Sequence, residues 1–369
     1  MRTYVDEILF MICEKLQLTP SLYEQATKRY DTITKTLEAA FAFHDITLKL
    51  YPHGSFRLKT TVKPLTSQEY DLDFVAELPA HSALTPNELY TQIADTLRHD
   101  GVHNNMVELK TRCVRIKYAN DFHMDIMPAK LINPETHEII VPDRELSNWY
   151  HHSNPIGFAE WFENQAKNKI LEEIKHRRRI QCSVEEVSDQ EIAAHLEPLR
   201  RAVQLVKRYR DVFSDKTEKE PVRSIVICTL MGQISNYSGD ALQIINSFCT
   251  YVNGLIANAK GKPFEVKNPV VDEILTEKWS EANNFSDFVD MMKALTYDIK
   301  ALQASHINSD MNKLMKKMFG ESITTDAILE YAKKISEARN SGNLSVTKDG
   351  VLKTDSRGIP VRKNTFYGS

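Results

Sequence analysis

YDLDFVAEL (residues 70–78) is the stretch that decides the fold. Asp71 and Asp73 are two residues apart, so a β-strand directs both carboxylates to the same face. A second stretch, FHMDIM (residues 122–127), carries Asp125 in an apolar run, and we expect it to form a neighbouring strand. Like charges held this close repel one another, and a cation between them offsets that repulsion. The two stretches therefore predict a cation site on a sheet.

The chemistry of the three aspartates favours magnesium. Mg²⁺ prefers hard oxygen ligands and completes its shell with water and substrate phosphates. Two such ions can stabilise both the attacking and the leaving oxygen of a nucleotidyl transfer. We therefore expect Asp71, Asp73 and Asp125 to hold two Mg²⁺ ions, with Mn²⁺ as a substitute. Three unrelated surface aspartates are the alternative interpretation.

Gly54 and Ser55 precede the first carboxylate strand, in HGSFRLK (residues 53–59). A glycine lets the backbone approach a phosphate closely. The helix-like stretch that follows offers unpaired N–H groups to the same phosphate. This pair therefore indicates a phosphate-binding turn beside the carboxylates.

The ordered set of Gly-Ser, Asp-x-Asp and a third Asp resembles the polymerase-β-type nucleotidyltransferases. Within that group the chain is most similar to the bacterial cyclic-oligonucleotide synthases related to cyclic GMP–AMP synthase, the cGAS/DncV-like nucleotidyltransferases or CD-NTases. The stretches that carry this resemblance are HGSFRLKT (53–60), EYDLDFVAEL (69–78), HMDIMPA (123–129), VPDRELSNWYHHSNP (141–155), LVKRYRD (205–211) and RKNTFYG (362–368).

The resemblance implies an α/β (α+β) fold, in which a nucleotidyltransferase lobe with a mixed sheet precedes a helical lobe and the site lies in the cleft between them. It assigns catalysis and metal binding to Asp71, Asp73 and Asp125, and nucleotide binding to Gly54, Ser55, Lys207 and Ser224. For Ser224, which follows Pro221, a helix N-cap is an equally good interpretation.

The activity implied is the joining of NTPs, ATP or GTP among them, into a cyclic di- or trinucleotide with release of pyrophosphate. In this family such a product is a second messenger in CBASS-type anti-phage signalling. A nucleotidyltransferase that modifies RNA or a protein is the nearest alternative, and a catalytically silent interaction module is a further one. The basic run at residues 176–179 is the one hint of an RNA groove.

Periodicity predicts the following elements. Helices are expected over 4–16, 20–43 and 85–101, and strands over 45–51, 70–78, 106–118, 122–130 and 138–142, with a turn at 120–121. Further helices are expected over 155–176, 192–213, 222–236, 241–259, 285–305 and 325–339. We therefore expect a catalytic lobe over 1–150, a helical lobe over 151–340 and a tail over 341–369, with an extended end at 361–367.

The predicted helix around residues 199–211 is amphipathic and basic. Arg200, Arg201 and Arg210 are interpreted as a solvated face, whereas Lys207 matches the family's triphosphate-binding lysine. Two tyrosines of the helical lobe, Tyr209 and Tyr237, could stack on a base, although core packing is the expected role of both.

Composition excludes several classes of protein. The formal net charge of −3 over 369 residues, with no zinc-binding His/Cys cluster, argues against activation by double-stranded DNA. Five scattered cysteines form no Cys-x-x-Cys pair, and neither a signal sequence nor a membrane span is apparent, so we expect a cytoplasmic protein. The C-terminal tail, ending Phe366-Tyr367-Gly368-Ser369, is a candidate site for a regulatory protein partner.

Overall fold

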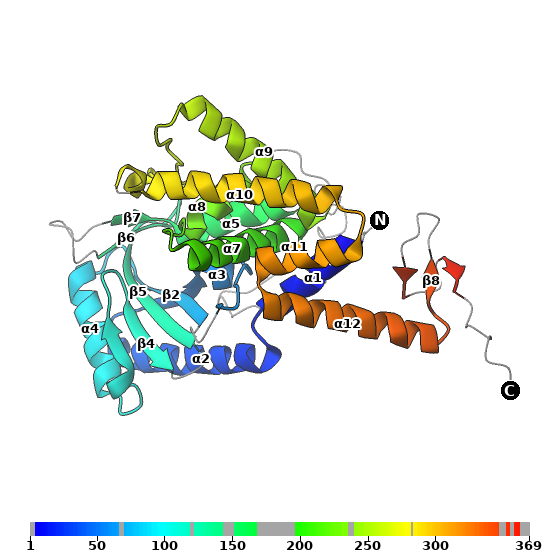
Figure 1. Cartoon of the computed structure of the whole chain (residues 1–369). Coiled ribbons are helices and arrows are strands. Elements are labelled where there is room, and N and C mark those ends of the chain that lie inside the picture. Colours follow the sequence, from blue (N-terminus) through cyan, green and yellow to red (C-terminus); the bar gives the residue numbers. More distant parts are fainter. Residues whose placement is uncertain are drawn as a thin grey trace.

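A mixed β-sheet and a bundle of helices make up the body of the chain (Figure 1). Both are seen in a computed structural model, which describes residues 4–65, 70–118, 122–142, 151–167, 196–234, 240–281, 283–346, 352–354 and 358–361.

The described strands of the main sheet are β1 (Lys49–His53), β2 (Tyr70–Leu78), β3 (Val107–Leu109), β4 (Val114–Tyr118), β5 (Phe122–Asn133), β6 (Glu138–Val141) and β7 (His151–Ser153). They run in the order β1-β2-β5-β4-β3, and β6 and β7 extend the sheet from β5. All paired neighbours are antiparallel except β2 and β5, which are parallel.

The parallel pair β2–β5 is the centre of the sheet. Its register sets Asp73 opposite Asp125, and Asp71 opposite His123. The alternate residues of β2, such as Leu72 and Phe74, are buried, as the period of a strand requires. The apolar side chains therefore hold the strands in the core, and the carboxylates project from the opposite face.

Helices α2 (Pro20–Ala42) and α4 (Pro86–His99) cover one face of the sheet (Figure 1). Local sequence sets their starts. Thr19 accepts a hydrogen bond from the Leu22 N–H at 3.3 Å, and Thr85 forms a capping box with Glu88. A proline occupies the first turn of each helix, where its missing N–H costs little.

The bundle shares one continuous apolar core. Its α1 packs against α12, although α1 precedes the sheet in the chain. Its helices are α1 (Tyr4–Leu16), α5 (Pro155–Ala166), α7 (Pro198–Thr217), α8 (Ser224–Gly232), α9 (Ala241–Ala259), α10 (Asn284–Ala304), α11 (Asn308–Phe319) and α12 (Glu321–Asn340). Short helices are α3 (Gly54–Arg57), η1 (Asn104–Met106) and η4 (Glu277–Ser280). None of the described helices combines the length and apolar character that a membrane crossing requires.

Beyond α12 the described residues of the tail form a small antiparallel sheet, in the order β10-β8-β9 (Figure 1). Its strands are β8 (Ser345–Val346), β9 (Leu352–Lys353) and β10 (Ile359–Pro360). This sheet was not predicted from the sequence, because each strand is too short to show an alternating pattern.

The structure confirms the α/β fold class and most of the predicted elements. The helix at 4–16 and the strand at 70–78 have the predicted bounds. The single strand predicted over 106–118 is wrong: Lys110 N–H bonds to Cys113 O at 3.0 Å, and this turn separates β3 from β4. Helix α11 and strand β7 were missed.

Some predicted bounds are also corrected. The first strand occupies Lys49–His53 rather than 45–51, and α12 begins at Glu321 rather than 325. α8 covers Ser224–Gly232 of the predicted 222–236. The three ranges expected for the lobes and the tail stay predictions.

Several expectations fall outside the described residues. They are the turn at 120–121, the connection at 143–150, the helical stretches at 168–176 and 192–195, the basic run at 176–179, Tyr237, and the C-terminal end at 362–369.

Candidate active site

The three predicted catalytic aspartates lie together on the central strands. Asp71 and Asp73 belong to β2, and Asp125 lies directly opposite Asp73 on β5. Their environments differ, because the Asp71 side chain is 60% exposed whereas that of Asp125 is 13% exposed. The parallel pairing thus brings together carboxylates that are about fifty residues apart in the chain.

Arg115 contacts two of these aspartates directly, and the sequence did not single it out. It lies on β4, directly opposite Asp125. Its Nε and Nη2 atoms donate to Oδ1 and Oδ2 of Asp125, each at 2.7 Å, and Nη2 lies 3.2 Å from Oδ1 of Asp71. This hydrogen bonding raises the pKa of the Arg115 guanidinium. Counting residues around the turn between β4 and β5 would have found this partner.

Asp73 is the aspartate of this group whose charged form is least favoured. Burial, together with the carboxylates of Asp125 and Asp71, raises the pKa of Asp73 to about 7. A cation bound here would favour the charged form of Asp73.

Gly54 lies against Asp73, because the antiparallel β1–β2 pairing sets His53 opposite Asp73. Its φ of +60° is a conformation that other residues rarely adopt. A Cβ atom at Gly54 would lie 2.3 Å from Asp73 Oδ2. Only glycine therefore fits both the turn and the close approach to the carboxylate.

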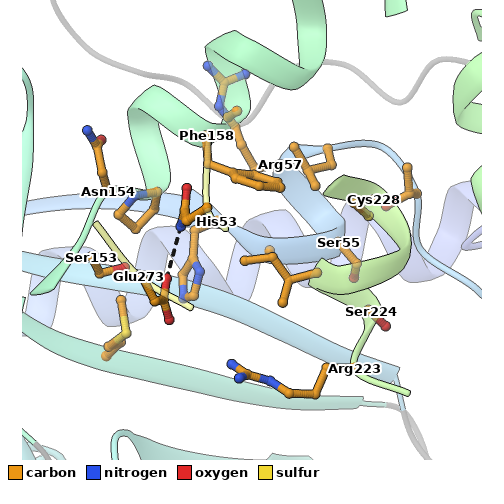
Figure 2. Close-up of a pocket in the computed structure, with 18 of the residues that line it drawn as sticks. His53, Ser55, Arg57, Ser153, Asn154, Phe158, Arg223, Ser224, Cys228 and Glu273 are labelled. Carbon is orange, nitrogen blue, oxygen red and sulfur yellow. Dashed lines mark hydrogen bonds between the residues drawn. The ribbon is translucent and has the colours of Figure 1, made fainter. Parts of the chain in front are cut away.

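A cavity of about 210 Å³ opens beside Gly54. It brings together all four residues that the sequence assigned to nucleotide binding: Gly54, Ser55, Lys207 and Ser224. Figure 2 shows Ser55 and Ser224 on one side and Ser153 and Glu273 on the other.

The charged residues that line the cavity are mostly basic. The residues that sequence reasoning missed include Arg57, Arg112 and Arg223, which with Lys207 provide four cations. Glu273 is the one carboxylate among the described lining residues, and it accepts a hydrogen bond from Asn268 Nδ2 at 2.9 Å (dashed in Figure 2). These residues are scattered through the chain, so no local motif marks them. The charge balance suits an anionic ligand.

Lys207 is buried on α7, and its Nζ donates to Thr60 O at 2.9 Å. Burial lowers the pKa of this lysine. Thr60 belongs to the segment that follows Gly54 and Ser55, so the lysine contacts the predicted phosphate turn from the helical side.

Ser224 has a different role from the predicted N-cap. The N-cap of α8 is Arg223, and Ser224 is the first helical residue. Its Oγ accepts a hydrogen bond from Arg210 Nη1 at 2.9 Å. The N-cap interpretation is therefore wrong, and Ser224 remains at the cavity wall.

The solvated face predicted for the basic residues of α7 is also wrong. Arg200 and Arg201 are each 5% exposed, and Arg210 bonds to Val222 O and Ser224 rather than facing water alone. Arg200 donates to Leu58 O and pairs with Glu197 at 2.7 Å. These cations are buried because carbonyl and carboxylate oxygens satisfy them.

Tyr209, by contrast, packs in the core as expected. It is 4% exposed, and its hydroxyl donates to Asp298 at 2.9 Å.

The carboxylates fit a magnesium site in their chemistry and in the strand face that they share. All three offer hard oxygen ligands on one face of two neighbouring strands, and the guanidinium of Arg115 already sets positive charge against two of them. Over the described ranges, no group of three or more Asp, Glu, His or Cys residues is arranged to hold a metal ion as it stands. The residues present offer the oxygen ligands that Mg²⁺ prefers, but Arg115 already binds some of these carboxylate oxygens.

Residues 5–166 match the family described as Second Messenger Oligonucleotide or Dinucleotide Synthetase domain. A curated relative, the c-di-GMP synthase of Roseivirga ehrenbergii, is 28% identical over 100% of this chain and 98% of its own length. The solved structure of the Bradyrhizobium diazoefficiens CD-NTase CdnG in complex with GTP has a TM-score of 0.71 and 21% identity, and covers 89% of this chain and 99% of that one. The structure of Vibrio cholerae DncV cyclic AMP-GMP synthase, in complex with a linear intermediate, has a TM-score of 0.56 and 16% identity. The match covers 75% of this chain and 69% of that one. Taken with the carboxylate strands and the cavity, these matches show that residues 5–166 resemble a Second Messenger Oligonucleotide or Dinucleotide Synthetase domain and that the chain is similar to bacterial CD-NTases over nearly its whole length.

Proposed function

We propose that this protein is a Mg²⁺-dependent synthase that joins two NTPs into a cyclic dinucleotide and releases pyrophosphate. One observation carries the proposal: Asp71, Asp73 and Asp125 lie side by side on β2 and β5, Asp73 packs against Gly54, and Gly54 lines a cavity whose charged residues are mainly basic. Acidic and basic groups in contact with one another are what the transfer of a nucleotidyl group from a triphosphate needs.

The basic side of the cavity is proposed to bind the triphosphate. Ser55 and the N–H groups at the start of the turn face the phosphates, and Lys207 neutralises their charge. Ser224 contributes its hydroxyl at the start of α8. Because Lys207 is buried and already bonded to Thr60 O, the phosphates would meet a lysine whose position is set in advance.

The acidic side is proposed to carry the chemistry. When bound, Mg²⁺ supplies positive charge that lowers the pKa of the attacking hydroxyl and stabilises the leaving pyrophosphate. Asp71 and Asp73 would hold this charge beside the triphosphate, and Asp125 would hold it near the acceptor hydroxyl and act as the base that receives the hydroxyl proton. A 2′- or 3′-oxygen of one nucleotide bonds to the α-phosphorus of the other, and the bond from that phosphorus to pyrophosphate breaks.

A second transfer of the same kind closes the ring. The free hydroxyl of the linear intermediate attacks its own remaining α-phosphorus, and a second pyrophosphate leaves. The same residues serve both steps, so the intermediate must turn over within the cavity. The name of the Roseivirga relative, a c-di-GMP synthase, supports GTP as one substrate here.

The biological role is proposed from the family. The cyclic dinucleotide would act as a second messenger in CBASS-type anti-phage defence, in the cytoplasm, with a regulatory protein acting at the C-terminal tail. Double-stranded DNA is not expected to activate the enzyme, given its net charge of −3.

The identity of the reaction product tests the proposal. The purified protein is incubated with all four NTPs and Mg²⁺ or Mn²⁺, the mixture is treated with phosphatase, and mass spectrometry identifies what survives. We expect a phosphatase-resistant species with the mass of a cyclic dinucleotide that contains guanine.

Other products would change the assignment. Pyrophosphate release with linear products alone would favour an RNA or protein acceptor. Binding of Mg²⁺–NTP without pyrophosphate release, in the presence of the proteins encoded by neighbouring genes, would favour the catalytically silent module.

A further inference from the structure

We propose that Arg115 is a positioning residue that holds Asp71 and Asp125 together without metal and keeps metal affinity low until a nucleotide binds. The proposal rests on the function proposed above, since it takes these aspartates as metal ligands. It concerns a residue of this chain that lies outside the Asp-x-Asp motif and outside the cavity lining.

Arg115 and Asp125 form a partly buried, bidentate ion pair rather than a loose surface contact. Both oxygens of Asp125 accept hydrogen bonds from it at 2.7 Å, the bidentate form that is stronger than a single contact. The side chains of Arg115 and Asp125 are 20% and 13% exposed, so solvent screens the pair only partly. The strand register fixes the partners, because β4 sets Arg115 directly opposite Asp125.

The same guanidinium reaches the second strand. Its Nη2 lies 3.2 Å from Asp71 Oδ1, so one arginine links a carboxylate of β5 to one of β2. Without this charge, the carboxylates on these parallel strands would repel one another across the sheet. Arg115 therefore offsets, in the metal-free protein, the repulsion that Mg²⁺ would offset during the reaction.

A metal ion must compete with this arrangement. Any cation that takes an oxygen of Asp125 replaces a hydrogen bond from Arg115 and approaches a positive charge. Mg²⁺ with a nucleotide differs, because the triphosphate supplies further oxygens and negative charge, and fewer bonds to the protein are then needed. The site would thus favour the metal–nucleotide complex over free metal.

Lys117 provides a matched control on the same strand. It is two residues from Arg115, so it projects from the same face of β4, and it is also basic. Its Nζ pairs with Glu108 at 2.6 Å instead of with the aspartates. Removing Lys117 tests the loss of a positive charge on β4 without touching the carboxylates.

The test is the affinity of the nucleotide-free protein for Mn²⁺, followed by the electron paramagnetic resonance signal of free Mn²⁺. We expect Arg115→Met to bind Mn²⁺ about tenfold more tightly than wild type, the effect of releasing a charge-assisted hydrogen bond. Arg115→Lys keeps the charge but loses the two-donor guanidinium, so its Mn²⁺ affinity should lie between those of wild type and Arg115→Met. Lys117→Met should bind like wild type.

Thermal unfolding separates this role from a merely structural one. Arg115→Met should unfold at a lower temperature without metal, and Mn²⁺ should raise its melting temperature more than that of wild type. A purely structural arginine would lower both temperatures and leave the Mn²⁺ shift unchanged. If Arg115→Met does not fold, Arg115→Lys carries the comparison, with a tighter Mn²⁺ affinity as the expected result.

Two negative results are distinguishable. Mn²⁺ binding by wild type and by folded Arg115 variants with equal affinity, or weaker binding in the variants, overturns the role of Arg115 alone. An absence of Mn²⁺ binding in every variant, with GTP present as well as without it, overturns both this proposal and the proposed function.

Discussion

The acidic residues of β2 and β5 and the basic residues of α7 both approach the segment that starts at Gly54, the acidic ones through Asp73, but they are held in opposite ways. Asp71, Asp73 and Asp125 repel one another, and they are kept together by the apolar strands that carry them. The α7 residues are instead held by hydrogen bonds to backbone carbonyls of residues 58–63.

The spacing along α7 makes this second arrangement possible. Arg200, Gln204, Lys207 and Arg208 lie three to four residues apart or adjacent, on one side of the helix, and they donate to the carbonyls of Leu58, Thr61, Thr60 and Lys63. One helix stripe therefore braces the segment that follows Gly54 and Ser55.

The difference separates two kinds of function. The carboxylates carry negative charge that Arg115 offsets only in part, so they suit the binding of a cation. The α7 stripe has its charges satisfied by backbone oxygens, so it suits positioning of the phosphate turn. Substitutions on the two sides should therefore have different kinetic signatures.

The largest effect is expected from the acidic side. Asp71→Asn combined with Asp73→Asn should reduce pyrophosphate release to below about 1% of wild type, because two of three proposed metal ligands lose their charge. The melting temperature should stay the same or rise, because repulsion is removed. Loss of folding in circular dichroism would instead make these aspartates structural.

Gly54→Ala tests the contact between the two sides. The added Cβ would lie 2.3 Å from Asp73 Oδ2, so we expect turnover to fall by about a hundredfold through misplacement of the carboxylate. The positive φ adds strain of about 1–3 kcal/mol.

Gly101→Ala is the matched control for Gly54→Ala. Gly101 also has a positive φ, +77°, but nothing lies within 4 Å of its added Cβ. It should show a similar loss of stability in denaturant unfolding and near-normal turnover. Equal turnover in the two variants would contradict the proposed contact.

Lys207→Met tests the basic side alone. It removes the buried ammonium but keeps most of the apolar volume, so the apparent KM for GTP should rise at least about tenfold while kcat changes less. Lys216→Met, on the same helix but bonded to Lys317 O, serves as the control. A fall in kcat with unchanged KM would assign Lys207 to the chemical step.

The smallest effect is expected from Ser224→Ala. The hydroxyl accepts one hydrogen bond from Arg210, which also bonds to Val222 O and Asp211. Arg210 therefore keeps two partners when the Ser224 hydroxyl is removed. Steady-state kinetics should show a KM for GTP raised about fivefold or less. A collapse of activity would mean that Ser224 contributes far more than one neutral hydrogen bond.

Local patterns explain the predictions that the structure confirms. The period of two in Asp71-Leu72-Asp73 places both carboxylates on one face whatever the rest of the chain does. The N-terminus of α4 follows from Thr85, Pro86 and Glu88, which interact only with their own neighbours. Such features depend on residues a few positions apart.

The errors concern residues whose partners are distant in the chain. A basic helix face is normally solvated, but Arg200 is buried because Leu58 O lies against it, 142 positions away. Arg115 gave no motif: the β4–β5 hairpin sets it opposite Asp125, but its contact with Asp71 depends on the register of β5 against β2. Burial and the register between distant strands are set by packing, and no local pattern encodes them.

By itself, the sequence determined the class of the fold, the two carboxylate strands and the residues that gather at the cavity, because strand period and ordered motifs are properties of short segments. The tertiary structure alone decided which cation faces the aspartates and which charges α7 buries. Those outcomes depend on which strands pair and which carbonyls meet the helix, and chain segments far apart in sequence meet only when the whole protein packs.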